Sequence, residues 1–207
     1  MNDDPGANGQ RGIVVKRIED LALGTALLLF ALPLMVAIAV AIRLDTPGPV
    51  LFRQRRRGRN DSSFDILKFR TMVYVPGPEL TVPQARRHDP RVTRVGRVLR
   101  RTSLDELPQL FNVLKGEMSL VGPRPHALAH VERYGALIVG YADRHRVPPG
   151  ITGWAQVHGY RGETDTLEKM QHRVDHDLAY IANQSLLLDL KILVLTVRTV
   201  WRDHNAY

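Results

Sequence analysis

The chain has 207 residues, enough for one domain with a sizeable core. Its 29 Lys and Arg residues outnumber its 21 Asp and Glu residues, and the net charge of +8 favours anionic partners such as nucleic acid, lipid headgroups or phosphorylated substrates. The chain contains no cysteine, which excludes disulfides, thiolate zinc sites and a cysteine nucleophile.

An apolar segment without any charged residue occupies positions 21–42. As a helix rising about 1.5 Å per residue, it is long enough to cross a hydrocarbon core of roughly 30 Å. A cleaved signal peptide is the alternative, but the segment exceeds the usual length of a signal core and basic residues follow it. We therefore expect the segment to stay in the protein. The preceding residues 1–12 are polar and glycine-rich, which predicts a disordered N-terminus.

Basic residues flank this apolar segment on both sides. Lys16 and Arg17 precede it and an arginine-rich stretch at 53–59 follows it, and such residues mark cytoplasmic flanks. Pro33, near the middle, removes one backbone hydrogen bond and clashes with the preceding turn. These features predict a re-entrant membrane helix over 13–43 that is broken at Pro33 and has both ends in the cytoplasm. A kinked helix that crosses the membrane once is the alternative, because proline is common in true spans.

We expect residues 44–207 to form one domain. The fold is predicted to be mainly α with a small β element, which is an α+β class. Apolar runs around an arginine-rich turn predict two short strands, and a period of 3.6 residues predicts several helices. The strands are expected at 50–52 and 64–69, and the helices at 95–114 (interrupted at Pro108), 127–145, 166–181 and 185–201. The last helix interleaves leucines with charged residues. We expect it to be amphipathic and to lie at the membrane interface, with core packing as the alternative.

The densest polar group surrounds Asp105 and Glu106, which follow three arginines, a threonine and Ser103. Ser103 and Glu106 have the spacing of a capping box, so one interpretation is a capped helix start with arginines on the surface. The other interpretation is a phosphate site, because a helix N-terminus near arginines binds phosphate. An acidic residue there can attack phosphorus or bind Mg²⁺. The spacing alone does not separate the two interpretations.

Longer motifs surround this pair. They are, in chain order, KRxxD at 16–20, KFRTM at 68–72, RRTSLDELPQL at 100–110, NVLKGEMSLVGPRP at 112–125 and PGITGWAQV at 149–157. Together they closely resemble the bacterial sugar transferases, which are monotopic polyprenyl-phosphate phosphoglycosyl transferases. The segments 161–170, 177–181 and 205–207 are similar to the branch that initiates exopolysaccharides with UDP-glucose or UDP-galactose.

The resemblance implies an enzyme that transfers a sugar-1-phosphate from a UDP-sugar to undecaprenyl phosphate and releases UMP, the first membrane step of exopolysaccharide or other glycoconjugate assembly. Asp105 would be the nucleophile that carries the phosphosugar covalently and would also bind the cofactor Mg²⁺, and Glu106 would assist. Arg100 is expected near the lipid phosphate, and Arg124 on the nucleotide diphosphate. The other residues expected to bind substrate are Lys68, Arg70, Pro123, Pro125, Gln156 and Arg161. Pro33 matches the break in the re-entrant helix of the family.

The resemblance also places the protein at the bacterial inner membrane, with residues 44–207 forming a catalytic domain whose active site faces the cytoplasm. Membrane lipids are expected partners, a homodimer is considered, and nucleic acid is not expected. Two features depart from the family. First, the larger members carry additional transmembrane helices and an extra domain, so the chain is either a short member or the catalytic part of a longer one. Second, Pro148 occupies a position where a basic residue is frequent in the family. The rival interpretation is a non-enzymatic, membrane-tethered, basic nucleic-acid-binding protein, which leaves the Asp-Glu motif unexplained.

Overall fold

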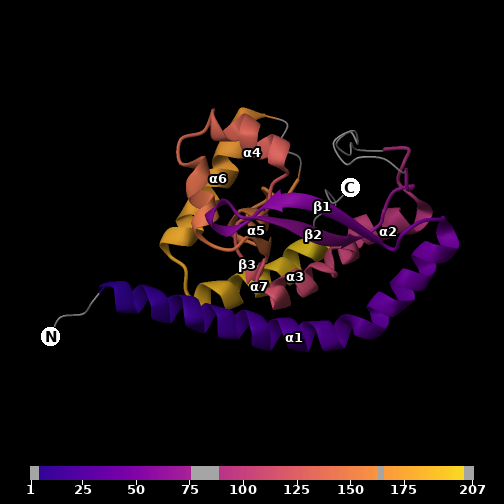
Figure 1. Cartoon of the computed structure of the whole chain (residues 1–207), viewed down its shortest axis with the longest axis horizontal. Coiled ribbons are helices and arrows are strands. Elements are labelled where there is room, and N and C mark those ends of the chain that lie inside the picture. The colour runs from indigo at the N-terminus through magenta and orange to yellow at the C-terminus, as the bar shows by residue number, and fades with distance from the viewer. Residues whose placement is uncertain (1–4, 76–88, 163–165, 203–207) are drawn as a thin grey trace.

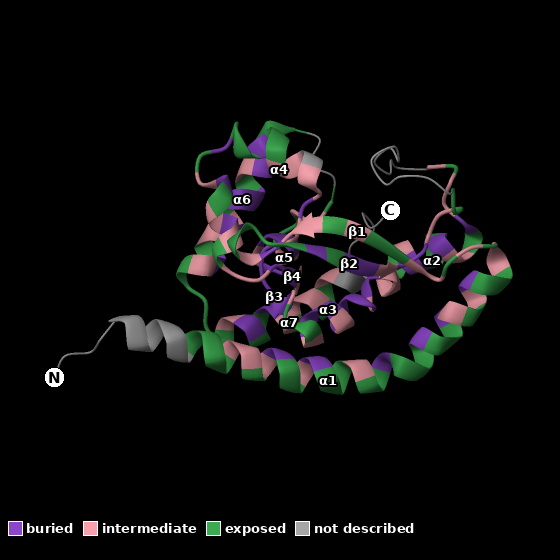
Figure 2. Ribbon diagram, in the orientation of Figure 1, coloured by how far each residue is buried: buried purple, intermediate pink, exposed green. Residues whose placement is uncertain are grey.

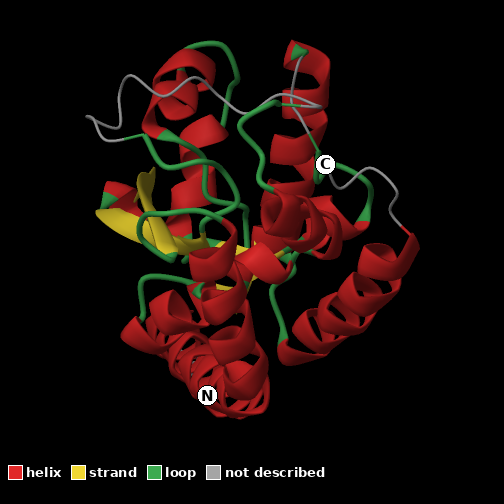
Figure 3. Ribbon diagram, turned by 90° about the vertical axis from the view of Figure 1, so that its right-hand side faces the viewer, coloured by secondary structure: helices red, strands yellow, loops and turns green. Residues whose placement is uncertain are grey.

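The structure, a computed structural model, describes residues 5–75, 89–162 and 166–202. Helices dominate and the strands form two small sheets, so the predicted α+β class with a minor β element is confirmed. The elements are α1 Pro5–Asp45, β1 Leu51–Arg57, η1 Arg59–Asp61, β2 Ser63–Phe69, α2 Arg94–Thr102, η3 Leu104–Glu106, α3 Gln109–Lys115, β3 Ser119–Val121, α4 Leu128–Gly135, η4 Tyr141–Arg146, β4 Gly150–Thr152, α5 Trp154–Val157, α6 Leu167–Ala182 and α7 Leu186–Arg202. In the view of Figure 3 the strands run at mid-height from the left edge of the molecule to its middle, with helices above and below them.

Helix α1 runs along one side of the molecule and curves in its second half (Figure 1). It is continuous through Pro33, which corrects the expected break: the proline lies inside a bent helix rather than between two helices. By length and composition its part from Gly12 to Asp45 could cross a membrane. Helix α1 begins at Pro5, inside the segment 1–12 for which disorder is predicted, and residues 1–4 lie outside the described residues.

One face of α1 packs on the domain and the other is exposed (Figure 2). The buried face carries Ala31, Met35, Ile38 and Ile42, which recur at helical spacing and pack against Phe69 of β2 and Leu99 of α2. The opposite side exposes large apolar side chains, and Phe30 is 86% exposed. An exposed apolar face of this size fits membrane association.

The first sheet is an antiparallel hairpin of β1 and β2, in register from Leu51 opposite Phe69 to Arg57 opposite Ser63. The arginine-rich stretch 53–59 therefore lies mostly in strand β1 and not in a turn, which corrects that expectation. The chain reverses through η1, where Asn60 and Asp61 take the left-handed conformation that such residues tolerate.

The second sheet pairs β3 and β4 in parallel, and three glycines permit the pairing. A Cβ atom on Gly150 would lie 2.1 Å from the backbone nitrogen of Gly122, and one on Gly153 would lie 2.2 Å from the Gly122 oxygen. Only glycine allows backbones to approach this closely. The main core lies beside this sheet and contains buried side chains from β2, α3, β3, α6 and α7, among them Phe64, Val113, Leu120, Tyr180 and Ile192.

Candidate active site

Asp105 and Glu106 lie in the tight turn η3 between α2 and α3. Ser103 ends α2 in the left-handed conformation, with φ of 59°, so the chain turns sharply before the pair. The Ser103 hydroxyl does not cap η3; it accepts a hydrogen bond from the Arg161 guanidinium instead. The capping-box interpretation is therefore wrong. The start of α2 is capped by Thr93, whose hydroxyl accepts from the Gly96 amide at 2.9 Å.

The Glu106 carboxylate is buried between two cations. Lys68 Nζ lies 2.8 Å from Oε1, and the Arg124 guanidinium binds both oxygens, with Nη2 2.6 Å from Oε1 and Nη1 3.3 Å from Oε2. Burial raises the pKa of Glu106, but the positive charges of Arg124 and Lys68 outweigh this effect and hold the pKa well below its usual range. Glu106 is thus an ionised carboxylate held by two charge-assisted contacts.

Asp105 has a different environment from its neighbour. Its side chain is half-buried, and burial raises its pKa above the usual range. Lys68 lowers the pKa, the adjacent Glu106 raises it, and Arg100 and Arg124 lower it by smaller amounts. A carboxylate with a raised pKa is more basic, and such perturbed groups concentrate at reactive sites. The pair therefore combines one fixed anion with one carboxylate suited to reaction.

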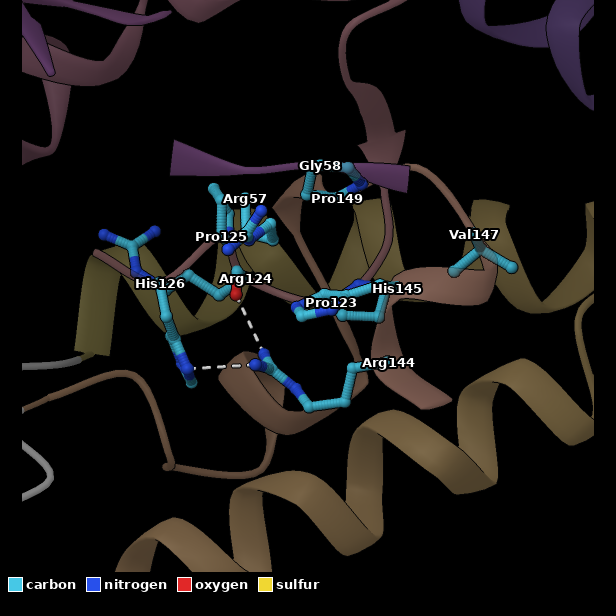
Figure 4. Close-up of a pocket in the computed structure, with 10 residues that line it drawn as sticks. All are labelled: Arg57, Gly58, Pro123, Arg124, Pro125, His126, Arg144, His145, Val147 and Pro149. Atoms are coloured by element: carbon cyan, nitrogen blue, oxygen red, sulfur yellow. Dashed lines mark hydrogen bonds between the residues drawn. The ribbon is translucent and has the colours of Figure 1, made fainter. Parts of the chain in front are cut away.

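The structure brings most of the predicted site residues to this turn. Lys68 and Arg124 contact Glu106, and Arg161 contacts Ser103. Arg124 lies on a loop between Pro123 and Pro125 that also borders a small pocket (Figure 4).

Arg70 and Gln156 have other partners. The Arg70 guanidinium donates to backbone oxygens at the end of α1, to Thr46 at 2.7 Å and Ile42 at 3.3 Å, and also to Pro47. Such contacts satisfy the carbonyls that a helix leaves unpaired at its C-terminus, so Arg70 joins α1 to the hairpin. Gln156 donates to the Ile151 oxygen at 3.1 Å.

An apolar groove opens beside the pair, between α1, η3, β4 and α7. It encloses about 1620 Å³, including space open to solvent. Its lining includes Leu27, Phe30, Ala31, Pro33, Leu34, Ser103, Leu104, Glu106, Leu107, Leu110, Thr152, Gln156, Val157, Arg161, Leu193, Thr196 and Thr199. The sequence did not predict that α7 lines this groove. The spacing of Leu193 and Thr196 shows that they share one face of the helix, but not which part of the protein that face contacts. The groove places Glu106 and Arg161 beside an otherwise mainly apolar wall.

A magnesium site that is completed by substrate fits these residues. Within the described ranges, no group of three or more His, Asp or Glu side chains lies close enough to hold a metal ion by itself. Mg²⁺ commonly binds through one or two carboxylates together with substrate phosphates and water. Glu106 is already paired with Lys68 and Arg124, which neutralise its charge. Of the two carboxylates, Asp105 is therefore the better candidate ligand for Mg²⁺.

The model of a family described as bacterial sugar transferases matches residues 11–203. The chain belongs to this family. A UDP-glucose:undecaprenyl-phosphate glucose-1-phosphate transferase of Escherichia coli (strain K12) is 56% identical to this sugar transferase over 194 residues, which are 94% of the chain and 42% of the relative. A Caulobacter vibrioides protein of the same name is 52% identical, over 93% of the chain and 72% of the relative.

A third relative is close to the chain in length. The exopolysaccharide production protein PSS of Rhizobium leguminosarum bv. phaseoli is 44% identical over 89% of the chain and 94% of its own length. The chain thus spans less than half of the Escherichia coli relative but nearly all of the Rhizobium one. Family membership together with the apolar helix α1 fits a membrane-associated transferase.

Proposed function

We propose that this sugar transferase moves a sugar-1-phosphate from a UDP-sugar, either UDP-glucose or UDP-galactose, to undecaprenyl phosphate and releases UMP. The names of the Escherichia coli and Caulobacter relatives support this reaction and favour UDP-glucose. The observation that carries the proposal is the contrast within the pair: Glu106 is held by Lys68 and Arg124, whereas burial raises the pKa of the half-buried Asp105.

In the first step, an Asp105 oxygen attacks the sugar-side phosphorus of the UDP-sugar. The bond from that phosphorus to the bridging oxygen breaks, and the bridging oxygen leaves with UMP. Arg124 and Lys68, which hold the adjacent Glu106, stabilise the negative charge that develops on the diphosphate oxygens as UMP leaves. Mg²⁺, when bound by Asp105 and the diphosphate, would add positive charge against the same oxygens.

In the second step, an oxygen of undecaprenyl phosphate attacks the phosphorus of the Asp105 adduct. The bond from phosphorus to the Asp105 oxygen breaks, which restores the carboxylate and leaves the sugar on an undecaprenyl diphosphate. A covalent adduct divides one difficult displacement into two easier ones. The groove between α1 and α7 suits the polyprenyl chain, with its phosphate end at Arg161, Ser103 and the pair. Arg100, whose charge acts on Asp105, is a second contact for the lipid phosphate.

The proposed location is the bacterial inner membrane, with the active site facing the cytoplasm. Helix α1 would enter the bilayer and return to the same side through its bend. Helix α7 would lie at the interface, because Leu187, Val194 and Val197 are 80%, 70% and 63% exposed. Accessibility labelling of residues before and after α1 tests this topology, and labelling of the two ends from opposite sides of the membrane would contradict it.

The reaction is tested with radiolabelled UDP-sugar, Mg²⁺ and undecaprenyl phosphate. The expected products are UMP and a lipid-linked sugar phosphate, and Asp105→Asn should abolish both turnover and the covalent adduct seen by mass spectrometry. An active Asp105→Asn variant would exclude Asp105 as the nucleophile. A protein without turnover on any UDP-sugar, but with tight and salt-sensitive DNA binding, would instead favour the nucleic-acid interpretation. The homodimer stays a prediction.

A further inference from the structure

A buried group of charged residues lies beneath the loop that carries Arg124; we name it the α6 cluster (His126, Arg144, Arg173 and Asp177). Arg144 and Asp177 are each 2% exposed, and Arg144 Nε donates to Asp177 Oδ2 at 2.8 Å. The other two ends of the Arg144 guanidinium reach the loop: Nη2 donates to the backbone oxygen of Arg124 at 2.8 Å, and Nη1 lies 2.9 Å from His126 Nδ1 (Figure 4). One guanidinium therefore joins helix α6 to the backbone of the loop.

Arg173, one helical turn before Asp177, makes a similar contact on the other side of the site. Its Nη2 donates to the Gly162 oxygen at 2.6 Å, and its Nη1 lies 3.4 Å from His126 Nε2. Gly162 directly follows Arg161, whose guanidinium donates to the Ser103 hydroxyl. Helix α6 therefore supplies Arg173 and also Asp177, the partner of Arg144 on η4. These two guanidinium groups hold the backbone at Arg124 and beside Arg161.

The cluster carries more positive than negative charge. Burial lowers the pKa of His126 well below its usual value, and Arg144 and Arg173 lower it further, so this ring is neutral. Burial, followed by the charges of Arg124 and Arg144, lowers the pKa of Arg173 to about 10, so Arg173 stays charged at neutral pH. Two buried guanidinium groups thus lie near one carboxylate: Arg144 is hydrogen-bonded to Asp177, and Arg173 acts on Asp177 through its charge. Burying an excess charge is costly, and a cost of this kind points to a role beyond packing.

We propose that the α6 cluster positions the two substrate arginines separately, Arg144 acting on Arg124 and Arg173 acting on Arg161. The inference rests on the proposed function and adds two positioning residues to it. Neither guanidinium is among the residues that line the groove. Each holds the backbone of a segment whose own arginine contacts the residues next to Asp105, Arg124 at Glu106 and Arg161 at Ser103. Because displacements of about 1 Å can change reaction rates by up to 100-fold, the precision of such a contact matters for rate.

Lysine substitutions test the proposal, since they keep the charge but cannot make the three-way guanidinium contact. In a two-step transfer, kcat/KM for the UDP-sugar reports the first displacement and kcat/KM for undecaprenyl phosphate reports the second. Arg144→Lys should lower the first value about tenfold and leave the second within twofold. Arg173→Lys should do the opposite. The matched control is Arg146→Lys, an exposed residue of the same η4 segment that pairs with Asp143 at 2.8 Å and should change neither value.

A double-mutant cycle separates positioning from general destabilisation. In an Arg124→Ala background, Arg144→Lys should have no further effect on kcat/KM for the UDP-sugar. If Arg144→Lys does not fold, Asp177→Glu moves the same guanidinium and should show the same donor-specific loss. Equal losses for both substrates, or additive losses in the cycle, would overturn the inference while the proposed function stands. A wild-type protein without turnover would overturn both.

Discussion

The two adjacent carboxylates should have opposite effects on stability. At pH 7, Asp105→Asn should raise the free energy of unfolding by about 1 kcal/mol, a usual gain when a substitution removes an unfavourable group from a functional site. Glu106→Gln should lower the free energy of unfolding by about 2 kcal/mol. The reason is that burial disfavours the ionised form of Asp105, whereas Lys68 and Arg124 stabilise the ionised form of Glu106.

The contacts of Glu106 set the size of its effect. It takes part in three contacts with two cations, at 2.8, 2.6 and 3.3 Å. Each such contact is worth roughly 1.5–3 kcal/mol. The Lys68 and Arg124 side chains are 21% and 23% exposed, so water replaces part of what is lost, and glutamine keeps one acceptor oxygen. A net loss of about 2 kcal/mol corresponds to a melting temperature lower by about 4–8 °C, and the gain for Asp105→Asn to about 2–4 °C.

Thermal unfolding in detergent micelles, followed by circular dichroism, measures both effects. The contribution of Glu106 is complete above its unfolded pKa near 4.5 and declines as the pH falls through its lower folded pKa. The cost of Asp105 is lost as the pH falls from its raised folded pKa to the ordinary value of 3.8. Both differences from wild type should therefore shrink toward acid pH. Asp143→Asn, on an exposed ion pair, is the control and should shift stability by less than about 0.5 kcal/mol. Shifts of the same sign for the two variants would refute the reasoning.

Three further predictions use other features. Chelation of Mg²⁺ should abolish turnover and leave the melting temperature nearly unchanged, because the proposed site draws on one carboxylate; a large loss of stability would contradict this. Gly150→Ala should prevent folding, judged by expression and circular dichroism, because its Cβ would meet backbone at 2.1 Å, whereas Gly135→Ala, with its nearest contact at 3.9 Å, should fold. Arg17→Gln should lower the melting temperature by about 4–8 °C, since Arg17 donates to two carbonyls at the end of α3 at 2.6 and 2.7 Å; an unchanged value would contradict a role in anchoring α1.

The spacing of apolar residues predicted those helices and strands whose apolar face repeats regularly within a short stretch of sequence. The predicted helices at 166–181 and 185–201 correspond to α6 and α7, and the predicted strand at 64–69 corresponds to β2. In each, the residues that repeat at the helical or strand period are the ones that meet the core, so the local pattern carries the needed information.

Contacts between distant segments could not be predicted in this way. Strand β3 is absent from the predicted elements, because a strand of three residues has no recognisable period and its pairing with β4 depends on glycine contacts between segments far apart in the chain. Arg70 lies in a family motif and was expected on substrate, yet its nearest partners are carbonyls at the end of α1. A residue that belongs to a motif can bind substrate or can stabilise the fold, and the motif alone does not distinguish these roles. Among the predicted site residues, those that meet at Glu106 were identified by resemblance and not by spacing.

The tight turn η3 explains how neighbouring carboxylates take different roles. Successive side chains in such a turn point about 120° apart, because it has three residues per turn. Ser103, in the left-handed conformation, ends α2 just before it, so Glu106 points inward to its cations while Asp105 is only half-buried. Arg124 therefore has a buried anionic partner before any substrate binds. In the proposed reaction, an incoming diphosphate would meet an arginine that is already oriented and charged, so the free site does not bury an unpaired cation.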